Sequence, residues 1–314
     1  MIIKRLKSLK LNWRVSGSLY IVPLRLTSLP FLGINMILTK LDYSMLKPEA
    51  AVAKFKKDFS FSSDIIVLDL PKAIKQRPTP KHWRDDCHSN YDDLFLQLSR
   101  HVGDVFGYSD LQNGKLIQEI FPIFEDRNKQ LGSGSVHLEL HTEDPAIAYR
   151  ADVIGFLCVR NDDKIPNLLS CPDFSTIDAI LKHSLTENRY TILSDRPSTI
   201  DYKPKALDTA VLQESPAEGY SFIYDPVYVD YSRMSKCEEL VFKDFIKLVE
   251  SSAFDLSMNE AQVLFVNNYK CAHGRPRFTP RYDGTDRWLK RVQISKDISK
   301  HLGREYSLDI ITDI

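Results

Sequence analysis

The chain has 314 residues, its 42 Lys and Arg equal its 42 Asp and Glu, and 43% of its residues are hydrophobic. This composition is that of an ordinary globular protein and excludes an intrinsically disordered or collagen-like chain. A chain of this length buries enough surface to fold without a disulfide or a structural metal, so a metal found here is expected to be functional. The body carries no excess of basic residues, and we expect no nucleic acid partner.

The amino-terminal segment departs from this balance. Residues 1–41 carry seven Lys and Arg and no acid, which leaves 35 basic against 42 acidic residues in the rest of the chain. Arg14, Pro23, Arg25 and Pro30 interrupt its apolar runs, so no membrane span or secretory core is expected. No repeat or linker divides the chain. We therefore predict one domain over residues 1–314, with a basic flank at 1–45, in the cytoplasm and without a membrane partner.

The five cysteines are scattered and show no CxxC spacing, which argues against a zinc ribbon. Their odd number and wide separation are typical of a reducing compartment. We expect all five to be free thiols: Cys87, Cys158, Cys171, Cys237 and Cys271.

Apolar spacing in chain order predicts helices over residues 49–57 and 91–106. Two further helices are predicted, from Asp173 or Ser175 to Leu185 and from Ser235 through Val249. The remaining ordered segments favour strands: Asp64–Leu70, Leu116–Phe121, Val136–Thr142, Val153–Val159, Tyr190–Leu193, Ala206–Leu212, Tyr220–Tyr224, Gln262–Asn267 and Trp288–Ile294. Many short strands with few helices to connect them predict a mainly β fold with flanking helices, built as an antiparallel sandwich or barrel.

The informative strand is Val136–Thr142, which the acidic pair Glu143 and Asp144 follows. Side chains alternate along a strand, so His137, Glu139, His141 and Glu143 are expected on one face. A His-x-Glu pair with one further histidine gives the ligand set of non-haem iron oxygenases. Two pairs compete for this role, His137/Glu139 and His141/Glu143. The alternative is an ordinary strand with one solvated polar face.

Two distant segments favour the metal interpretation. His273 is followed 14 residues later by Arg287, which opens a predicted strand. With these residues the chain resembles the clavaminate synthase-like iron(II)/2-oxoglutarate oxygenases of the TauD/TfdA-like superfamily, and within it the free arginine, asparagine and lysine hydroxylases. The resemblance rests on LIQEIFP (116–122), LELHTED (138–144), AYRADVIGFLCVRN (148–161), NNYKCAHGRPRF (267–278) and RYDGTDRWLKR (281–291).

The resemblance implies a double-stranded β-helix, or jelly-roll, core. It also implies that His141, Glu143 and His273 bind Fe(II), with His137 and Glu139 lining the same wall. Arg287 would hold the distal carboxylate of the cosubstrate 2-oxoglutarate, because a guanidinium donates two parallel charge-assisted bonds. The implied reaction uses O₂ to hydroxylate an unactivated C–H of a free L-amino acid and releases succinate and CO₂.

The resemblance also implies the substrate contacts. Gln118 and Glu143 would reach the substrate amine, and Arg291 would hold its carboxylate. Asp225 would bind the substrate side chain. The arginine hydroxylases carry a second acid where this chain has Val227, so a lysine-like substrate is preferred over arginine. The alternative for Asp225 is that it only shapes the turn before Pro226.

Two other functions stay open. A zinc hydrolase could use the same two histidines and glutamate, although the chain has no HExxH motif. An oxygenase could instead act on a carrier-bound or peptide substrate. The segment from His82 to His88 fits no zinc spacing and is expected to be a loop or lid, as is the stretch after Leu212. Gly132–Ser135 is expected to give flexibility beside the mouth of the active site.

Overall fold

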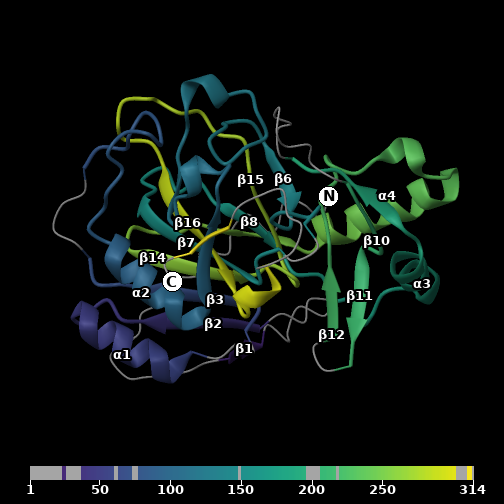
Figure 1. The fold of residues 1–314 in the computed structure, drawn as a ribbon, viewed down its shortest axis with the longest axis horizontal. Coiled ribbons are helices and arrows are strands. Elements are labelled where there is room, and N and C mark those ends of the chain that lie inside the picture. The colour runs from purple at the N-terminus through teal and green to yellow at the C-terminus, as the bar shows by residue number, and fades with distance from the viewer. Residues whose placement is uncertain are drawn as a thin grey trace, which may run out of the picture.

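The computed structural model describes residues 23–25, 37–59, 63–72, 77–147, 150–195, 206–216, 219–301 and 310–312, the first and last of these only as paired strands. Strands dominate and helices are few, which confirms a mainly β fold with flanking helices (Figure 1). Most of the predicted basic flank lies outside the described residues. None of the helices in the described ranges is long and apolar enough to cross a bilayer.

The larger sheet has nine strands and is antiparallel except where β2 runs parallel to β3. Its order is β1 (Pro23–Arg25), β2 (Ile37–Asp42), β3 (Ile65–Asp69), β14 (Gln262–Asn267), β7 (Val153–Arg160), β16 (Trp288–Ser295), β4 (Asp104–Tyr108) and β17 (Ile310–Thr312), with β5 (Gln118–Ile120) also paired to β16. The central strands β3, β7 and β14 are almost fully buried, because both faces of the sheet are covered.

The smaller sheet is antiparallel throughout. Its order is β13 (Ala253–Leu256), β8 (Asn167–Ser170), β15 (Ala272–Arg275) and β6 (Leu138–His141). Two separate hairpins pair β9 (Tyr190–Ile192) with β10 (Leu207–Thr209) and β11 (Leu212–Ser215) with β12 (Gly219–Phe222). Short 3-10 helices occupy Gln112–Gly114, Phe124–Asp126, Tyr231–Arg233 and Ile298–Lys300.

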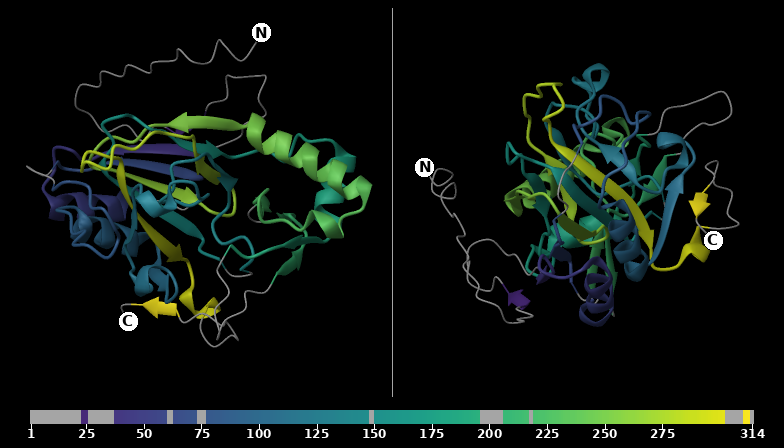
Figure 2. Two further views of the ribbon diagram at one scale, coloured as in Figure 1. Left: turned by 90° about the horizontal axis from the view of Figure 1, so that it is seen from above. Right: turned by 90° about the vertical axis from the view of Figure 1, so that its left-hand side faces the viewer.

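Four α-helices flank the strands: α1 (Pro48–Asp58), α2 (Asp92–Val102), α3 (Ala179–Glu187) and α4 (Lys236–Ser251). Helices α1 and α2 lie at one end of the molecule, whereas α3, α4 and the hairpins lie at the other end (Figures 1 and 2). The predicted start of α4 is confirmed, because Ser235 and Glu238 form a reciprocal capping box.

Alternating side chains of the same strands fill different cores. Ile66 and Leu68 of β3 belong to the cluster under α1 and α2. Their neighbours Ile65 and Val67 belong to a second cluster with Leu169 of the smaller sheet, so this cluster lies between the two sheets. A third cluster packs α3 and α4 against the hairpins. The cluster between the sheets continues into the walls of the site described below.

Most predicted elements differ from the structure by one or two residues at their ends, and three differ by more or in kind. Helix α2 ends at Val102, and residues 104–108 form strand β4 instead of continuing the helix to 106. A Cβ at Gly103 would collide with the carbonyl oxygen of Ser295, so glycine allows the chain to turn into β4 there. Helix α3 begins at Ala179, with Asp178 as its cap, not at Asp173 or Ser175. The predicted strand 206–212 is two strands, one in each hairpin.

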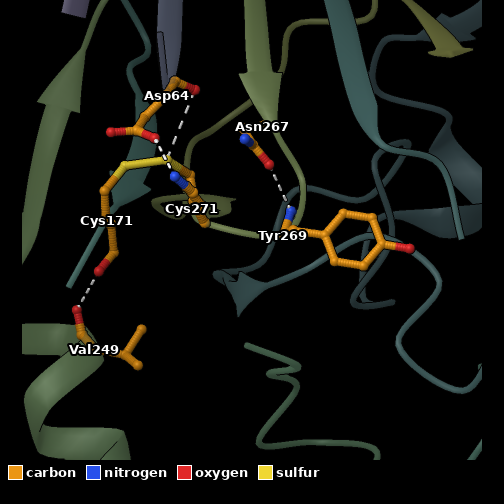
Figure 3. The surroundings of a disulfide bond; sticks show 8 residues. Asp64, Cys171, Val249, Asn267, Tyr269 and Cys271 are labelled. Atoms are coloured by element: carbon orange, nitrogen blue, oxygen red, sulfur yellow. Dashed lines mark hydrogen bonds and ion pairs between the residues drawn. A yellow bond between two sulfur atoms is a disulfide. The ribbon is translucent and has the colours of Figure 1, made fainter. Parts of the chain in front are cut away.

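The prediction that all five cysteines are free is also wrong. Cys171 and Cys271 form a disulfide with their Cα atoms 4.4 Å apart (Figure 3). Strands β8 and β15 pair Ser170 with Ala272, which places the two adjoining cysteines together. This contact joins residues 100 positions apart, so cysteine spacing could not show it. The other three, Cys87, Cys158 and Cys237, are free.

Candidate metal centre and its pocket

A cavity of about 160 Å³ lies between the two sheets. Its apolar walls include Leu138, Phe156, Leu169 and Leu289. Its polar lining includes most of the predicted site residues: His141, Glu143, His273, Arg287 and Arg291. Strands of both sheets therefore contribute to a single pocket.

His141, Glu143 and His273 lie together in this cavity. One potential ligand atom from each lies within 4.8 Å of the others, and no other such group occurs in the described ranges. The two histidines are direct partners in the β6–β15 pairing, with ring centroids 4.6 Å apart. Glu143 Oε2 lies 3.3 Å from His273 Nε2. Two segments 130 positions apart thus present two imidazoles and one carboxylate to the same point.

The competing pair His137/Glu139 lies elsewhere. These side chains are 45% and 38% exposed, pair with each other at 3.3 Å, and are absent from the cavity lining. The prediction that all four polar residues share one wall is therefore wrong. The β6–β15 register shifts by one residue between His141 and Leu138, so these two residues, three apart, both line the cavity.

The backbone carbonyl group of Glu139 fixes the tautomer of His141. Its Nδ1 lies 2.9 Å from the carbonyl oxygen of Glu139, which can only accept a hydrogen bond. Nδ1 therefore carries the proton, and Nε2 is left with a lone pair. Metal-binding histidines commonly donate their other ring N–H in this way.

Asn268 fixes the backbone of Glu143. This fully buried amide accepts a hydrogen bond from the Glu143 N–H at 2.7 Å and donates to the carbonyl oxygens of Glu143 at 3.1 Å and Ala151 at 2.9 Å. It lies five residues before His273 and so connects the two segments that carry the cluster. Asn268 is a functional residue that the sequence motifs do not reveal, although it lies within the stretch NNYKCAHGRPRF.

The electrostatics suit a metal. Burial would raise the pKa of Glu143, but the Arg291 guanidinium and the His273 imidazole outweigh burial and hold it well below its usual value. Burial, together with the neighbouring His141, lowers the pKa of His273 to about 4. At neutral pH the cluster therefore presents a carboxylate and a neutral imidazole. Glu143 Oε2 is buried without a hydrogen-bond partner, and this donor set fits Fe(II).

Arg287 lies at another side of the cavity. It is 5% exposed and donates from Nη2 to Asn167 Oδ1 at 2.6 Å, while its Nε is buried without a partner. Burial, with Arg275 nearby, lowers its pKa to about 9, so it remains charged at neutral pH. A buried guanidinium with unused donors is able to bind an anion.

Gln118 and Arg291 form a pair across β5 and β16, where they are register partners. Gln118 Oε1 accepts from Arg291 Nε at 2.9 Å and Nη2 at 2.5 Å, and Arg291 Nη1 donates to Glu143 Oε1 at 2.5 Å. The structure thus brings together the three residues predicted to bind the substrate backbone. Arg291 donates hydrogen bonds to a side-chain oxygen of Gln118 and to one of Glu143.

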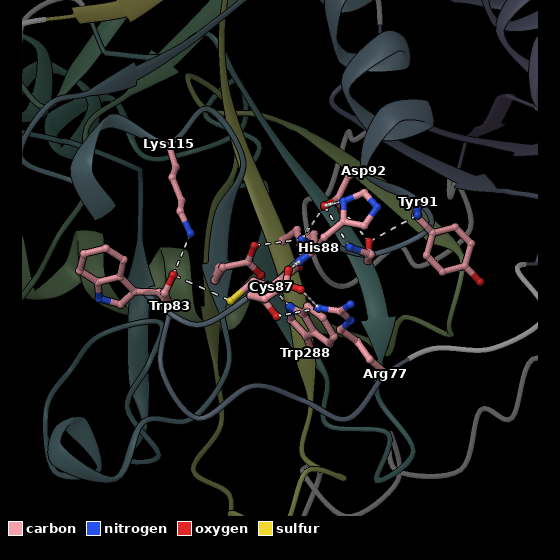
Figure 4. Close-up of polar contacts among 12 residues, drawn as sticks. Arg77, Trp83, Cys87, His88, Tyr91, Asp92, Lys115 and Trp288 are labelled. Carbon is pink, nitrogen blue, oxygen red and sulfur yellow. Dashed lines mark hydrogen bonds and ion pairs between the residues drawn. The ribbon is translucent and has the colours of Figure 1, made fainter.

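A buried polar network supports this pair from the opposite face of the same strands (Figure 4). Lys290, only 1% exposed, donates to Asp92 and Glu119, each at 2.9 Å, and to the Cys87 carbonyl oxygen at 2.7 Å. The Trp288 indole N–H donates to Glu119 at 2.7 Å. The segment around Cys87 therefore contributes to a structural network, and it contributes to no metal-binding cluster in the described part of the chain.

Asp225 is buried, and its Oδ1 accepts the backbone N–H of Val227 at 2.9 Å and of Tyr228 at 3.2 Å. It therefore shapes the turn, as the alternative interpretation expected. Burial raises its pKa, and His141 opposes this rise. Asp225 is absent from the cavity lining, but the backbone of the preceding Tyr224 bonds to Thr142, which lies between His141 and Glu143. A second acid, Asp195, lines the cavity. Gly132 also lines it, in the loop expected beside the mouth.

No protein-family model matches the chain. Among curated proteins it is 28% identical to an L-ornithine/L-arginine 3-hydroxylase of Catenulispora acidiphila, over 70% of this chain and 73% of the relative. It is 27% identical to an L-asparagine oxygenase of Streptomyces coelicolor, over 79% and 76%. An L-lysine 4-hydroxylase of Flavobacterium johnsoniae is 25% identical, over 64% and 57%.

Among solved structures, the non-haem iron oxygenase OrfP in complex with Fe and alpha-ketoglutaric acid superposes with a TM-score of 0.71 and 30% identity, over 83% of this chain and 84% of that one. OrfP in complex with Fe, succinate and (3S)-hydroxy-L-Arg gives 0.70 and 30%, over 82% and 84%. By this identity and coverage, and by the amino acid hydroxylases among its relatives, the chain belongs to the clavaminate synthase-like family of non-haem iron oxygenases.

Proposed function

We propose that this chain hydroxylates an unactivated C–H of a free basic L-amino acid, using Fe(II), 2-oxoglutarate and O₂ and releasing succinate and CO₂. The observation that carries the proposal is the meeting of His141, Glu143 and His273 in one cavity with Arg287. We also infer that the two sheets around this cavity form the double-stranded β-helix core that the family resemblance implies.

In this proposal His141, Glu143 and His273 hold Fe(II) on one side only. Three protein ligands leave coordination positions for the cosubstrate and for dioxygen. The iron supplies the oxidising chemistry, and the protein supplies position and a closed site. The apolar walls, such as Phe156 and Leu289, exclude water from the reacting C–H.

Arg287 would bind the distal carboxylate of 2-oxoglutarate. Its bond to Asn167 fixes one side of the guanidinium, and its buried Nε remains a donor without a partner. The planar fork of arginine suits a carboxylate better than the point charge of lysine. Burial strengthens this contact, because the local dielectric is lower than that of water.

Arg291, Gln118 and Glu143 would bind the amino acid backbone by an exchange of partners. In the described structure Arg291 donates to Gln118 Oε1 and Glu143 Oε1. A substrate carboxylate would draw Arg291 to itself and free both oxygens. An ammonium needs such acceptors, so the two charged ends of a free amino acid replace contacts that the site makes internally.

The substrate side chain is assigned to the acids beside this position. Asp225 follows Tyr224, whose backbone bonds to Thr142 between His141 and Glu143, and Asp195 lines the cavity. Val227 stands where a second acid of the arginine hydroxylases is expected, so a single ammonium, as in lysine, suits this end better than a guanidinium. Two of the three named curated relatives are hydroxylases of ornithine or arginine and of lysine, which supports a basic substrate, and the third is an asparagine oxygenase. None of the three is a hydrolase, so the hydrolase alternative is not favoured.

The test is a screen of the twenty common amino acids and ornithine with Fe(II), 2-oxoglutarate and ascorbate. Succinate and a mass gain of one oxygen are the readouts. We expect the highest coupled turnover with lysine or another basic amino acid. Absence of turnover with every free amino acid would contradict the proposal and redirect the search to carrier-bound or peptide substrates.

A further inference from the structure

Two buried arginines face the same cavity from different sheets. Arg275, which ends β15, is 2% exposed, and Arg287, which precedes β16, is 5% exposed. Both belong to the cavity lining.

Among the described residues, only neutral groups accept hydrogen bonds from these two guanidiniums. Arg275 donates to the carbonyl oxygens of Pro276 and Gly134, each at 2.9 Å, and of Val136 at 3.1 Å. Arg287 donates to the amide oxygen of Asn167. Within the described ranges neither forms an ion pair with a carboxylate.

The two buried cations of strand β16 differ: Lys290 pairs with Asp92 and Glu119, and Arg291 pairs with Glu143. Arg150 is also buried and donates to the carbonyl oxygens of Phe222 and Asn268, but it does not belong to the cavity lining. Buried charges are ordinarily paired with an opposite charge, because desolvation is costly and neutral acceptors compensate it only in part. Two positive charges in the lining of one cavity, neither of them bonded to a carboxylate in the described ranges, raise that cost further and favour an anionic ligand in the cavity.

We propose that Arg275 is a second cationic group of the cosubstrate site, which stabilises the distal carboxylate of 2-oxoglutarate by its charge while Arg287 makes the direct contact. This inference rests on the proposed function and deepens it. A carboxylate between two cations is bound more tightly than one held by a single guanidinium, so the site selects keto acids that carry the second carboxylate.

The competing explanation is that Arg275 has only a structural role. Its bonds to Gly134 and Val136 attach the loop before β6 to β15, and its guanidinium stacks on Phe278, 4.6 Å from the ring centroid. Lysine keeps the charge but offers a compact ammonium in place of the guanidinium fork. Arg275→Lys therefore separates the two explanations. If the charge of Arg275 matters, this variant should bind 2-oxoglutarate nearly as well as wild type, and if Arg275 is only structural, the variant should lose affinity.

The experiment compares Arg275→Gln, Arg275→Lys and the wild-type protein, each loaded with Mn(II) under anaerobic conditions. Calorimetry gives the affinity for 2-oxoglutarate and for 2-oxobutyrate, which lacks the distal carboxylate. Arg281→Gln is the matched control, because Arg281 is an exposed arginine paired with Asp163 at 2.8 Å. It removes the same charge away from the cavity lining.

We expect Arg275→Gln to weaken 2-oxoglutarate binding about tenfold or more, which corresponds to about 1.4 kcal/mol, and to change 2-oxobutyrate binding less than about threefold. Arg275→Lys should stay within about threefold of wild type for both ligands, and Arg281→Gln should change neither. The inference is overturned if Arg275→Gln keeps wild-type affinity, or if Arg275→Lys loses both ligands alike. Failure of the wild-type protein to bind 2-oxoglutarate would refute the proposed function itself.

Discussion

Asn268→Ala is the perturbation whose size follows most directly from the structure. The side chain satisfies the N–H and C=O of Glu143 and the C=O of Ala151, and it is fully buried. A buried backbone group left without a partner costs about 1–3 kcal/mol. Allowing for local relaxation, we expect the variant to lose about 3–5 kcal/mol of unfolding free energy.

The same change should weaken the metal site. Two of the three bonds orient Glu143, and loss of a group that orients a ligand commonly costs 10–100-fold in metal affinity. Asn268→Asp keeps an acceptor for the Glu143 N–H but turns a carboxylate oxygen toward two carbonyl oxygens. We therefore expect it to be at least as damaging as Asn268→Ala at neutral pH.

Urea unfolding of the metal-free protein and calorimetric Mn(II) binding measure the two effects. The neighbouring Asn267→Ala is the matched control, because the Asn267 side chain accepts one hydrogen bond, from the Tyr269 N–H at 3.0 Å, whereas Asn268 is the residue bonded to Glu143. Asn267→Ala should lower the free energy of unfolding by about 1 kcal/mol and leave the affinity for Mn(II) unchanged. The reasoning fails if Asn268→Ala unfolds within about 1 kcal/mol of wild type and binds Mn(II) equally well.

Three further changes have defined outcomes. Arg287→Lys should weaken 2-oxoglutarate binding by about tenfold although charge is retained, because the bidentate contact is lost; an unchanged dissociation constant in calorimetry would contradict this. Asp225→Asn keeps an oxygen for the turn, so it should leave the melting temperature nearly unchanged but lower kcat/KM for lysine more than for neutral amino acids; equal losses would remove Asp225 from the substrate site. Reduction of the Cys171–Cys271 bond, which spans 100 residues, should lower the unfolding free energy by up to about 4 kcal/mol; chemical denaturation with and without reductant measures it, and no difference would count against the bond.

Local signals in the sequence predicted much of the fold. Strand β14 has the predicted bounds, 262–267, because a continuous apolar run fits a strand covered on both faces. Helix α4 begins where Ser235 and Glu238 indicate a capping box. Features that depend on distant pairing were not predictable. Strand β4 continues a helical apolar pattern and is a strand because it pairs with β16.

The same division applies to the site. The motifs identified His141, Glu143 and His273, and the structure brings these residues together. The sequence alone does not show which face of the strand carries the His137 side chain. A one-residue register shift between β6 and β15 interrupts the regular alternation of side chains between the two faces. Asn268 was missed because its role depends on a contact across 125 positions.

Metal stoichiometry in four proteins tests the central claim, that residues 141, 143 and 273 hold one ion, most directly. Equilibrium dialysis against Fe(II) under anaerobic conditions, followed by elemental analysis, should give one iron per chain for wild type. His141→Ala and His273→Ala should bind none, and the exposed His137→Ala should bind one. Retention of iron by His273→Ala, or its loss only in His137→Ala, would contradict the assigned centre.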